Sequence, residues 1–217
     1  MSGESPPAIA VLDYGIGNLR SAEKALQRCG ADARLVADPE VARRSPAVVL
    51  PGVGAFGRCM EALGATGLDR VVLEATGEGR PFLGICVGMQ LLYGGSQEAP
   101  GVAGLDIVEG IIRRLPAGIT CPQMQWNRLE ARPGAEAMLA GLGPAPWMYF
   151  VHSYAPPDGP DVVATCDYGG PVSAAVIRGP LWATQFHPEK SGKVGLGLLA
   201  NFVAATGVSN TGRARSL

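Results

Sequence analysis

Charged residues are scarce and balanced in this chain of 217 amino acids. There are 18 Lys and Arg against 19 Asp and Glu, so the net charge is −1 and charged residues make up 17% of the chain, compared with roughly a quarter in typical globular proteins. Because there is no run of basic residues, nucleic acid is not an expected partner. The large neutral surface is explained equally well by a permanent partner subunit and by a chain rich in Ala and Gly.

A long apolar run is also missing. Hydrophobic residues make up 47% of the chain, yet no stretch reaches the about 18 apolar residues that a membrane-spanning helix needs, so no membrane association is expected. Residues 1–7 lack the basic flank and the apolar core of a secretory signal. We therefore expect a cytoplasmic protein.

The cysteines do not form the patterns of a disulfide framework or a zinc site. They are odd in number and contain no C-x-x-C pair, which argues for a reducing compartment and against a metal; they are Cys29, Cys59, Cys86, Cys121 and Cys166. Residues 14–18 (Tyr-Gly-Ile-Gly-Asn) are half of a dinucleotide-binding fingerprint, but the third glycine and the later acidic residue are absent. No cofactor is expected.

Cys86 differs from the other cysteines in its neighbours. An apolar run, residues 81–85, leads to it, and Gly84 and Gly88 lie two positions before and after it. This pattern is typical of a sharp strand-to-helix turn that presents a nucleophile. A position at a helix N-terminus favours the thiolate, which is the reactive form.

Histidine is rare, which limits the candidates for a general base to His152 and His187. His187 and Glu189 are two residues apart, and such residues point to the same side of an extended chain. We predict that Glu189 orients the imidazole while His187 accepts the proton of Cys86, completing a triad of nucleophile, base and carboxylate. His152 either contacts substrate or only packs.

The first half of the chain alternates predicted strands with predicted helices. Apolar runs predict buried strands at residues 9–13, 33–36, 47–50 and 81–85, and apolar residues at helical spacing predict helices at 19–29, 56–63 and 68–75. We expect Asn18 to cap the first helix and Pro51-Gly52 to end the third strand. The alternation is typical of a parallel sheet with helices on both faces.

The second half is predicted to be mostly strands, which would extend the sheet in a mixed or antiparallel way. The predicted strands are 107–113, 124–130, 149–154, 162–167, 172–178 and 181–186, followed by a helix at about 194–205. The length fits a single domain, 1–217, with loose tails at about 1–7 and 207–217. The expected fold is therefore a three-layer α/β fold.

Several motifs make the chain similar to the class I glutamine amidotransferases, which pair a G-x-C-x-G turn with a later His-Pro-Glu. The resemblance is closer to one branch, the glutaminase subunits of imidazole glycerol phosphate synthase, and covers residues 13–191; its motifs are Asp13-Tyr-Gly-Ile-Gly-Asn-Leu19, Pro51-Gly-Val-Gly-Ala-Phe56, Gly84-Ile-Cys-Val-Gly-Met-Gln90, Met124-Gln-Trp-Asn127, Tyr149-Phe-Val-His-Ser-Tyr154 and His187-Pro-Glu-Lys-Ser191.

This resemblance implies the class I glutamine amidotransferase fold and the hydrolysis of L-glutamine to glutamate and ammonia through a thioester. It also implies a heterodimer with a cyclase subunit, which would receive the ammonia through a channel. The products would be imidazole glycerol phosphate and aminoimidazole-carboxamide ribonucleotide, in histidine biosynthesis.

The resemblance also implies roles for individual residues. Cys86, His187 and Glu189 match the triad. The backbone N–H groups of an oxyanion hole match Gly52 or Val53 together with Val87; the glutamine-binding residues match Gln90, Glu98, His152, Ser153 and Tyr154; and the cyclase interface matches Asn18, Trp126 and Lys190. One departure is that Gln123 and Gln125 replace the family's usual His and Gly, in a segment that lies near the interface in the family.

Three alternatives remain open at this point. A turn and triad of this kind serve acyl transfer in general, so an esterase or peptidase fits the same chemistry. The glutaminase of another synthase, such as the one that makes pyridoxal phosphate, usually has Pro-Gly-Gly-Glu-Ser where this chain has Pro51-Gly-Val-Gly-Ala55. A silent regulatory scaffold would keep the fold without activity, although the complete triad argues against it.

Overall fold

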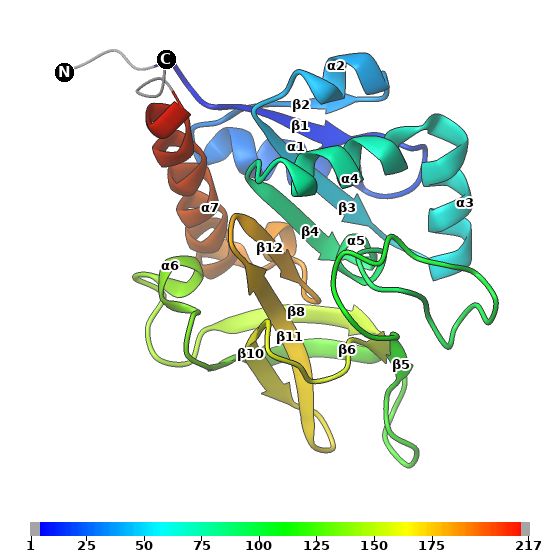
Figure 1. Ribbon diagram of the computed structural model, residues 1–217. Helices are drawn as coiled ribbons and strands as arrows, with labels where there is room; N and C mark the ends of the chain where they lie inside the picture. Colours follow the sequence, from blue (N-terminus) through cyan, green and yellow to red (C-terminus); the bar gives the residue numbers. More distant parts are fainter. Residues whose placement is uncertain (1–4, 214–217) are drawn as a thin grey trace.

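An eight-stranded sheet forms the centre of the computed structural model, which describes residues 5–213 (Figure 1). The strand order is β2-β1-β3-β4-β12-β11-β10-β7. Neighbours from β2 to β12 are parallel, and those from β12 to β7 are antiparallel. The predicted parallel sheet with an antiparallel extension is confirmed.

The parallel strands are short and almost wholly apolar because both of their faces are covered. They are β1 (Ala8–Leu12), β2 (Asp32–Val36), β3 (Ala47–Gly52), β4 (Phe82–Cys86) and β12 (Leu181–Thr184). One face carries α1 (Leu19–Arg28) and α7 (Gly192–Arg213), and the other carries α2 (Pro39–Arg43), α3 (Phe56–Thr66) and α4 (Leu68–Gly77) (Figure 1). The predicted three layers are present.

The antiparallel part of the chain adds strands at one edge and two small separate sheets. The edge strands are β11 (Pro171–Arg178), β10 (Val162–Asp167) and β7 (Glu130–Ala131). The small sheets pair β5 (Arg113–Arg114) with β9 (Tyr154–Ala155) and β6 (Gln123–Arg128) with β8 (Trp147–His152). Short helices complete the fold: α5 (Val87–Gln90), α6 (Glu136–Leu139) and the 3₁₀ turn η1 (Pro188–Lys190).

Several boundaries differ from the predictions. Strand β3 continues through Pro51 to Gly52. Strand β1 pairs with β3 only as far as Val49, so no hydrogen bond to β1 is lost because Pro51 lacks a backbone N–H. Residues 107–113 are not a strand apart from Arg113, since Asp106 and Gly110 have φ of 53° and 122° and break the extended chain.

The last helix is longer than the predicted 194–205. Helix α7 runs to Arg213, past residue 207 where a loose tail was expected, while 1–4 and 214–217 lie outside the described residues. The short helices α2 and α6 were not predicted at all.

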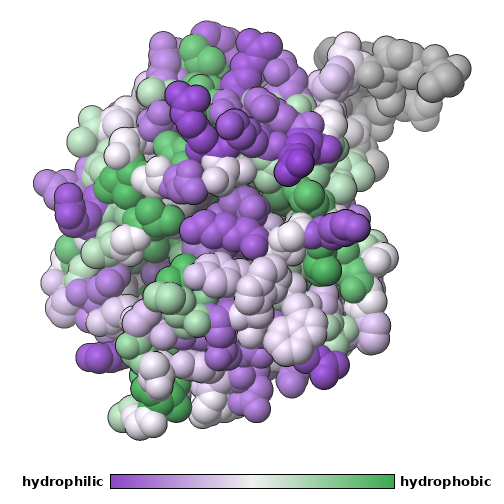
Figure 2. Space-filling view, turned by 180° about the vertical axis from the view of Figure 1, so that it is seen from behind, coloured by the Kyte–Doolittle hydropathy of each residue, from purple (hydrophilic) through white to green (hydrophobic). Residues whose placement is uncertain are grey.

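Hydrophilic and hydrophobic residues alternate over one face of the molecule (Figure 2). On the face opposite to that of Figure 1, polar and apolar side chains are intermixed in small groups (Figure 2). In the described part of the chain, no helix has the length and hydropathy needed to cross a membrane.

Candidate active site

The sharp turn predicted at Cys86 is present where β4 passes into α5. Cys86 has φ 55° and ψ −113°, a conformation that residues other than glycine rarely adopt. A Cβ on Gly88 would lie 1.9 Å from the Leu50 carbonyl oxygen, and one on Gly52 would lie 2.6 Å from the Gly88 nitrogen. The turn therefore depends on backbone packed directly against backbone, which only glycine permits.

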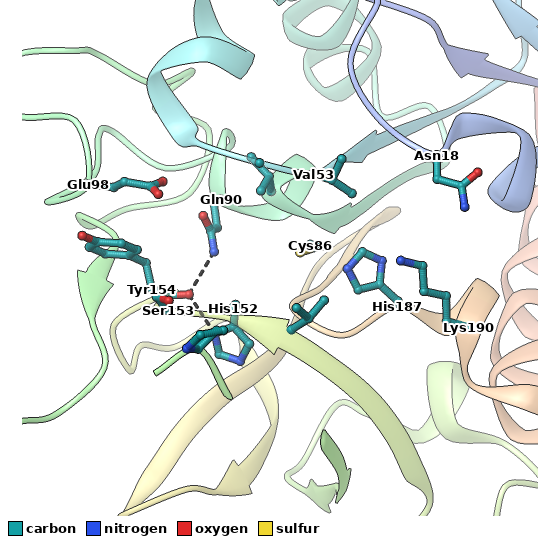
Figure 3. A pocket seen from close by; sticks show the side chains of 14 residues that line it. Asn18, Val53, Cys86, Gln90, Glu98, His152, Ser153, Tyr154, His187 and Lys190 are labelled. Carbon is teal, nitrogen blue, oxygen red and sulfur yellow. Dashed lines mark hydrogen bonds between the residues drawn. The ribbon is translucent and has the colours of Figure 1, made fainter. Parts of the chain in front are cut away.

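Cys86 lies in the wall of a pocket of about 410 Å³ (Figure 3). Cys86 is only 3% exposed, so its sulfur is reached through the pocket and does not project from the surface. The helix that follows has four residues, so its macrodipole contributes less at Cys86 than the sequence suggested.

His187 and Glu189 make the contact that their spacing predicted. The His187 Nδ1 lies 2.7 Å from a Glu189 carboxylate oxygen, and the two side chains are 2% and 6% exposed. The local conformation is different from the prediction, since His187 precedes the 3₁₀ turn η1 and Glu189 lies within it. The His187 N–H donates to the Tyr149 carbonyl at 3.0 Å, and the Ser191 hydroxyl donates to the His187 carbonyl at 2.7 Å. His187 is thus held on a rigid turn.

The surroundings of His187 favour its protonated form. Burial lowers the pKa of His187, but hydrogen bonds to Cys86 and Glu189 and the charges of these two groups outweigh burial and raise it to about 9. Nδ1 is engaged by Glu189, so Nε2 is the nitrogen that can exchange a proton with Cys86. A histidine of this kind is suited to take a proton from a thiol and keep it.

A network of side-chain amides lies beside the sulfur. The Gln90 amide donates to the Tyr154 carbonyl and to the Gln185 side-chain oxygen, each at 2.9 Å. The Gln185 amide in turn lies 3.8 Å from the Cys86 sulfur. Gln185 was not predicted as a site residue, although it lies within Gln185-Phe-His-Pro-Glu189 and its position in this segment could have indicated it.

His152 forms part of the pocket wall in its neutral form. Its Nδ1 lies 2.9 Å from the Tyr154 carbonyl, which can only accept, so Nδ1 carries the proton. Burial lowers the pKa of His152 to about 4. Figure 3 shows His152 on the opposite side of the pocket from Val53. His152 is therefore neutral between about pH 4 and pH 9, where His187 is protonated.

Three further residues, Val53, Gly54 and Glu98, belong to the pocket wall near the start of α3. We call residues 51–54, at the end of β3, the oxyanion strand, after the role that the family resemblance implies for them; Gly52 lies in register with Cys86, and Val53 and Gly54 line the pocket. A Glu98 oxygen accepts from the Phe56 N–H at 2.8 Å, at the start of α3. This bond holds the Glu98 carboxylate at the pocket.

The pocket gathers most of the predicted residues. It is lined by Cys86, Val87, His187, Val53, Gln90, Glu98, His152, Ser153, Tyr154, Asn18 and Lys190, and in addition by Gly54, Pro122 and Val151, which were not predicted. Gly52 and Glu189 do not line it: Gly52 belongs to the oxyanion strand, and Glu189 contacts the Nδ1 of His187. Asn18 is at the predicted start of α1, but its side chain makes no capping hydrogen bond.

Trp126 lies outside the pocket, on the exposed face of β6. It is 47% exposed, next to Met124 at 62%, and its ring contacts that of Tyr149 edge to face. The two glutamines that depart from the family pattern have different environments: Gln125 is exposed, whereas Gln123 is fully buried opposite His152. Gln123 is therefore a core residue and does not belong to the exposed face.

Known protein sequences match most of this chain. The family model for glutamine amidotransferase class-I matches residues 10–205. The chain is 52% identical over 200 residues to imidazole glycerol phosphate synthase subunit HisH of Deinococcus radiodurans, covering 90% of this chain and 93% of that protein. It is 48% identical over 196 residues to the HisH of Methanothermobacter thermautotrophicus, covering 90% and 97%.

The fold is also similar to that of a solved structure. A crystal structure of a glutamine amidotransferase matches with a TM-score of 0.72 at 24% identity, covering 92% of this chain and 98% of that one. The predicted family and enzyme class are confirmed, and the chain belongs to the class I glutamine amidotransferases and, within them, to the HisH subunits of imidazole glycerol phosphate synthase.

Proposed function

We propose that this chain hydrolyses L-glutamine to glutamate and ammonia with Cys86 as nucleophile, His187 as general base and acid, and Glu189 as the carboxylate that orients His187. The observation that carries the proposal is the buried 2.7 Å contact between His187 and Glu189 beside the sharp turn at Cys86. The chain is the HisH-type subunit of imidazole glycerol phosphate synthase, so the ammonia serves histidine biosynthesis.

The reaction proceeds in two halves. His187 takes the thiol proton of Cys86, and the thiolate attacks the side-chain amide carbon of glutamine to form a tetrahedral oxyanion. When this intermediate collapses, the imidazolium of His187 gives its proton to the leaving nitrogen, and ammonia departs from a thioester. Water then gives a proton to His187 and attacks the thioester, which releases glutamate and restores the Cys86 thiol.

The oxyanion is stabilised by backbone N–H groups at the turn. The N–H of Val87, directly after Cys86, is one donor, and the N–H of Gly52 or Val53 on the neighbouring oxyanion strand is the other. Each such donor is worth about 3 kcal/mol in comparable sites. If the Val53 peptide must turn for its N–H to face the pocket, the free subunit is nearly idle and the cyclase switches it on.

The substrate glutamine occupies the remainder of the pocket. The amide N–H groups of Gln90 are used by Tyr154 and Gln185, so its carbonyl oxygen is the group that faces a substrate donor. The Glu98 carboxylate is suited to the α-ammonium of glutamine. His152, Ser153 and Tyr154 complete the wall and hold the substrate in place.

Ammonia must leave without meeting bulk water, because it becomes the non-nucleophilic ammonium at neutral pH. A sealed route into the cyclase subunit avoids this loss. Asn18 and Lys190 at the pocket wall and Trp126 on the exposed face of β6 are the residues that we assign to this interface. A large exposed aromatic side chain of this kind is typical of an interface anchor. We place the complex in the cytoplasm.

Replacing Cys86 by Ala tests the proposal. In the complex with the cyclase, Cys86→Ala should abolish product formation from glutamine and leave product formation from added ammonium salt intact. Intact-mass analysis after exposure to glutamine should show a thioester on the wild-type chain but not on Cys86→Ala. Cys166→Ala, at another buried cysteine, is the control and should keep glutamine-dependent activity. Glutamine hydrolysis by Cys86→Ala would refute the mechanism.

A further inference from the structure

Two side chains from separate elements hold the oxyanion strand from its inner side. Tyr14, in the loop after β1, donates its hydroxyl to the Pro51 carbonyl at 2.8 Å. Cys59, near the start of α3, donates its thiol to the Val53 carbonyl at 3.4 Å. Tyr14 is 3% exposed and Cys59 is fully buried, so solvent does not compete for either bond. The two side chains also contact each other.

These two bonds lie on either side of a single peptide. The Pro51 carbonyl belongs to the peptide before Gly52, and the Val53 carbonyl belongs to the peptide after Val53. No described side chain bonds to the group between them, which consists of the Gly52 carbonyl and the Val53 N–H. Because each peptide group is planar, a change at this point is a rotation of one peptide while its neighbours are held.

The packing and the protonation of Tyr14 and Cys59 both allow them to hold the oxyanion strand as hydrogen-bond donors. A Cβ on Gly52 would lie 3.0 Å from the Tyr14 hydroxyl, so the hydroxyl is packed against the strand, whereas Gly54 has φ 92° and open space around it. Burial raises the pKa of Tyr14 well above its usual range, and burial also raises the pKa of Cys59. Both groups keep their protons at neutral pH and remain donors.

We propose that Tyr14 and Cys59 are positioning residues for the oxyanion hole. By holding the Pro51 and Val53 carbonyls, they confine reorientation of the oxyanion strand to the peptide between Gly52 and Val53 and direct its N–H toward the oxyanion. The inference rests on the proposed glutaminase function. Neither side chain lines the pocket, so they act on turnover and leave glutamine binding unchanged.

The test uses variants that remove one donor at a time, measured in the complex with the cyclase. Tyr14→Phe and Cys59→Ala should each lower kcat for glutamine hydrolysis by about five- to tenfold, the effect of one neutral hydrogen bond. KM should change by less than about twofold, since only the transition state loses an interaction. Cys59→Ser should restore kcat, because its hydroxyl can donate to the same carbonyl.

Matched controls remove the same kinds of bond elsewhere. Cys29→Ala removes a thiol bond to the Leu196 carbonyl at 3.3 Å, and Tyr168→Phe removes a hydroxyl bond to the Thr120 carbonyl at 2.6 Å. Both should keep the wild-type kcat. Alkylation of Cys86 by iodoacetamide needs the thiolate but no oxyanion hole, so its rate should be the same in all variants.

Each contrary outcome is informative. The inference is overturned if Tyr14→Phe and Cys59→Ala keep the wild-type kcat, if alkylation slows in parallel with kcat, or if Cys59→Ser does not recover. If Tyr14→Phe does not fold, the comparison of Ala with Ser at position 59 decides. Failure of the proposed function is a separate result, because it would appear as a wild-type complex that does not hydrolyse glutamine or as an active Cys86→Ala.

Discussion

Replacing Glu189 by Gln should lower the pKa of His187 and with it the protonation on which turnover depends. In the wild-type chain, contacts with Cys86 and Glu189 raise the pKa of His187 from 6.5 to about 9, against the opposing effect of burial. This rise corresponds to about 3 kcal/mol of preference for the imidazolium. The Glu189 side chain is 6% exposed, so solvent screens its charge only weakly.

Glutamine keeps the size and a hydrogen-bonding oxygen of Glu189 but removes the charge. We expect the pKa of His187 to fall by about 1–2 pH units, the usual effect of losing an adjacent opposite charge. A raised pKa in the folded state stabilises the fold fully below pH 6.5 and not at all once the pH has passed about 9. The stability difference between wild type and Glu189→Gln should therefore be largest below pH 6.5 and shrink as the pH rises through 9.

Nuclear magnetic resonance titration of the histidine ring signals measures this directly. The chain has only two histidines, and His152, with a pKa of about 4, serves as an internal reference that should stay where it is. Glu40→Gln, which removes a surface carboxylate paired with Arg43, should leave both histidines unchanged. A pKa of His187 near 6.5 in the wild type, or one that does not move in Glu189→Gln, would refute the reasoning.

Three further predictions concern other parts of the molecule. Because the pKa of His152 is lowered to about 4, the wild type should lose up to about 3 kcal/mol of stability as the pH falls from 6.5 to 4, and His152→Gln should lose less in urea unfolding over that range. Gly88→Ala, whose Cβ would meet the Leu50 carbonyl, should destabilise by more than about 3 kcal/mol, whereas Gly64→Ala, with open space in α3, should stabilise by about 0.5–1 kcal/mol. Trp126→Ala should weaken the cyclase complex by about 2 kcal/mol or more in calorimetry, while Leu73→Ala, an exposed side chain on α4, should leave the dissociation constant unchanged.

The parts of the fold that could be predicted are those with a strong local signal. Strand β10 has its predicted bounds, 162–167, because a mostly apolar segment rich in β-branched residues lies between Gly159-Pro160 and Gly169-Gly170. Residues 107–113 have equally apolar side chains, but Asp106 and Gly110 turn the backbone there. Apolar content alone does not distinguish a buried loop from a strand.

In the candidate site too, contacts within one short segment could be predicted, whereas contacts that depend on strand pairing could not. His187 and Glu189 lie in one short segment, so their contact followed from the sequence even though the local conformation did not. Gln185 and Cys86 are 99 residues apart, and their proximity exists only because β12 pairs with β4. The burial of Gln123 likewise depends on the pairing of β6 with β8, which no local pattern encodes.

The dihedral angles at Cys86 set fold stability and turnover against each other at a single residue. A positive φ on a residue with a side chain costs about 1–3 kcal/mol, and glycine at position 86 would relieve that cost while deleting the sulfur. Any library of this protein that is screened by melting temperature alone will therefore tend to enrich inactive chains at this position, and such a screen needs a turnover measurement beside it.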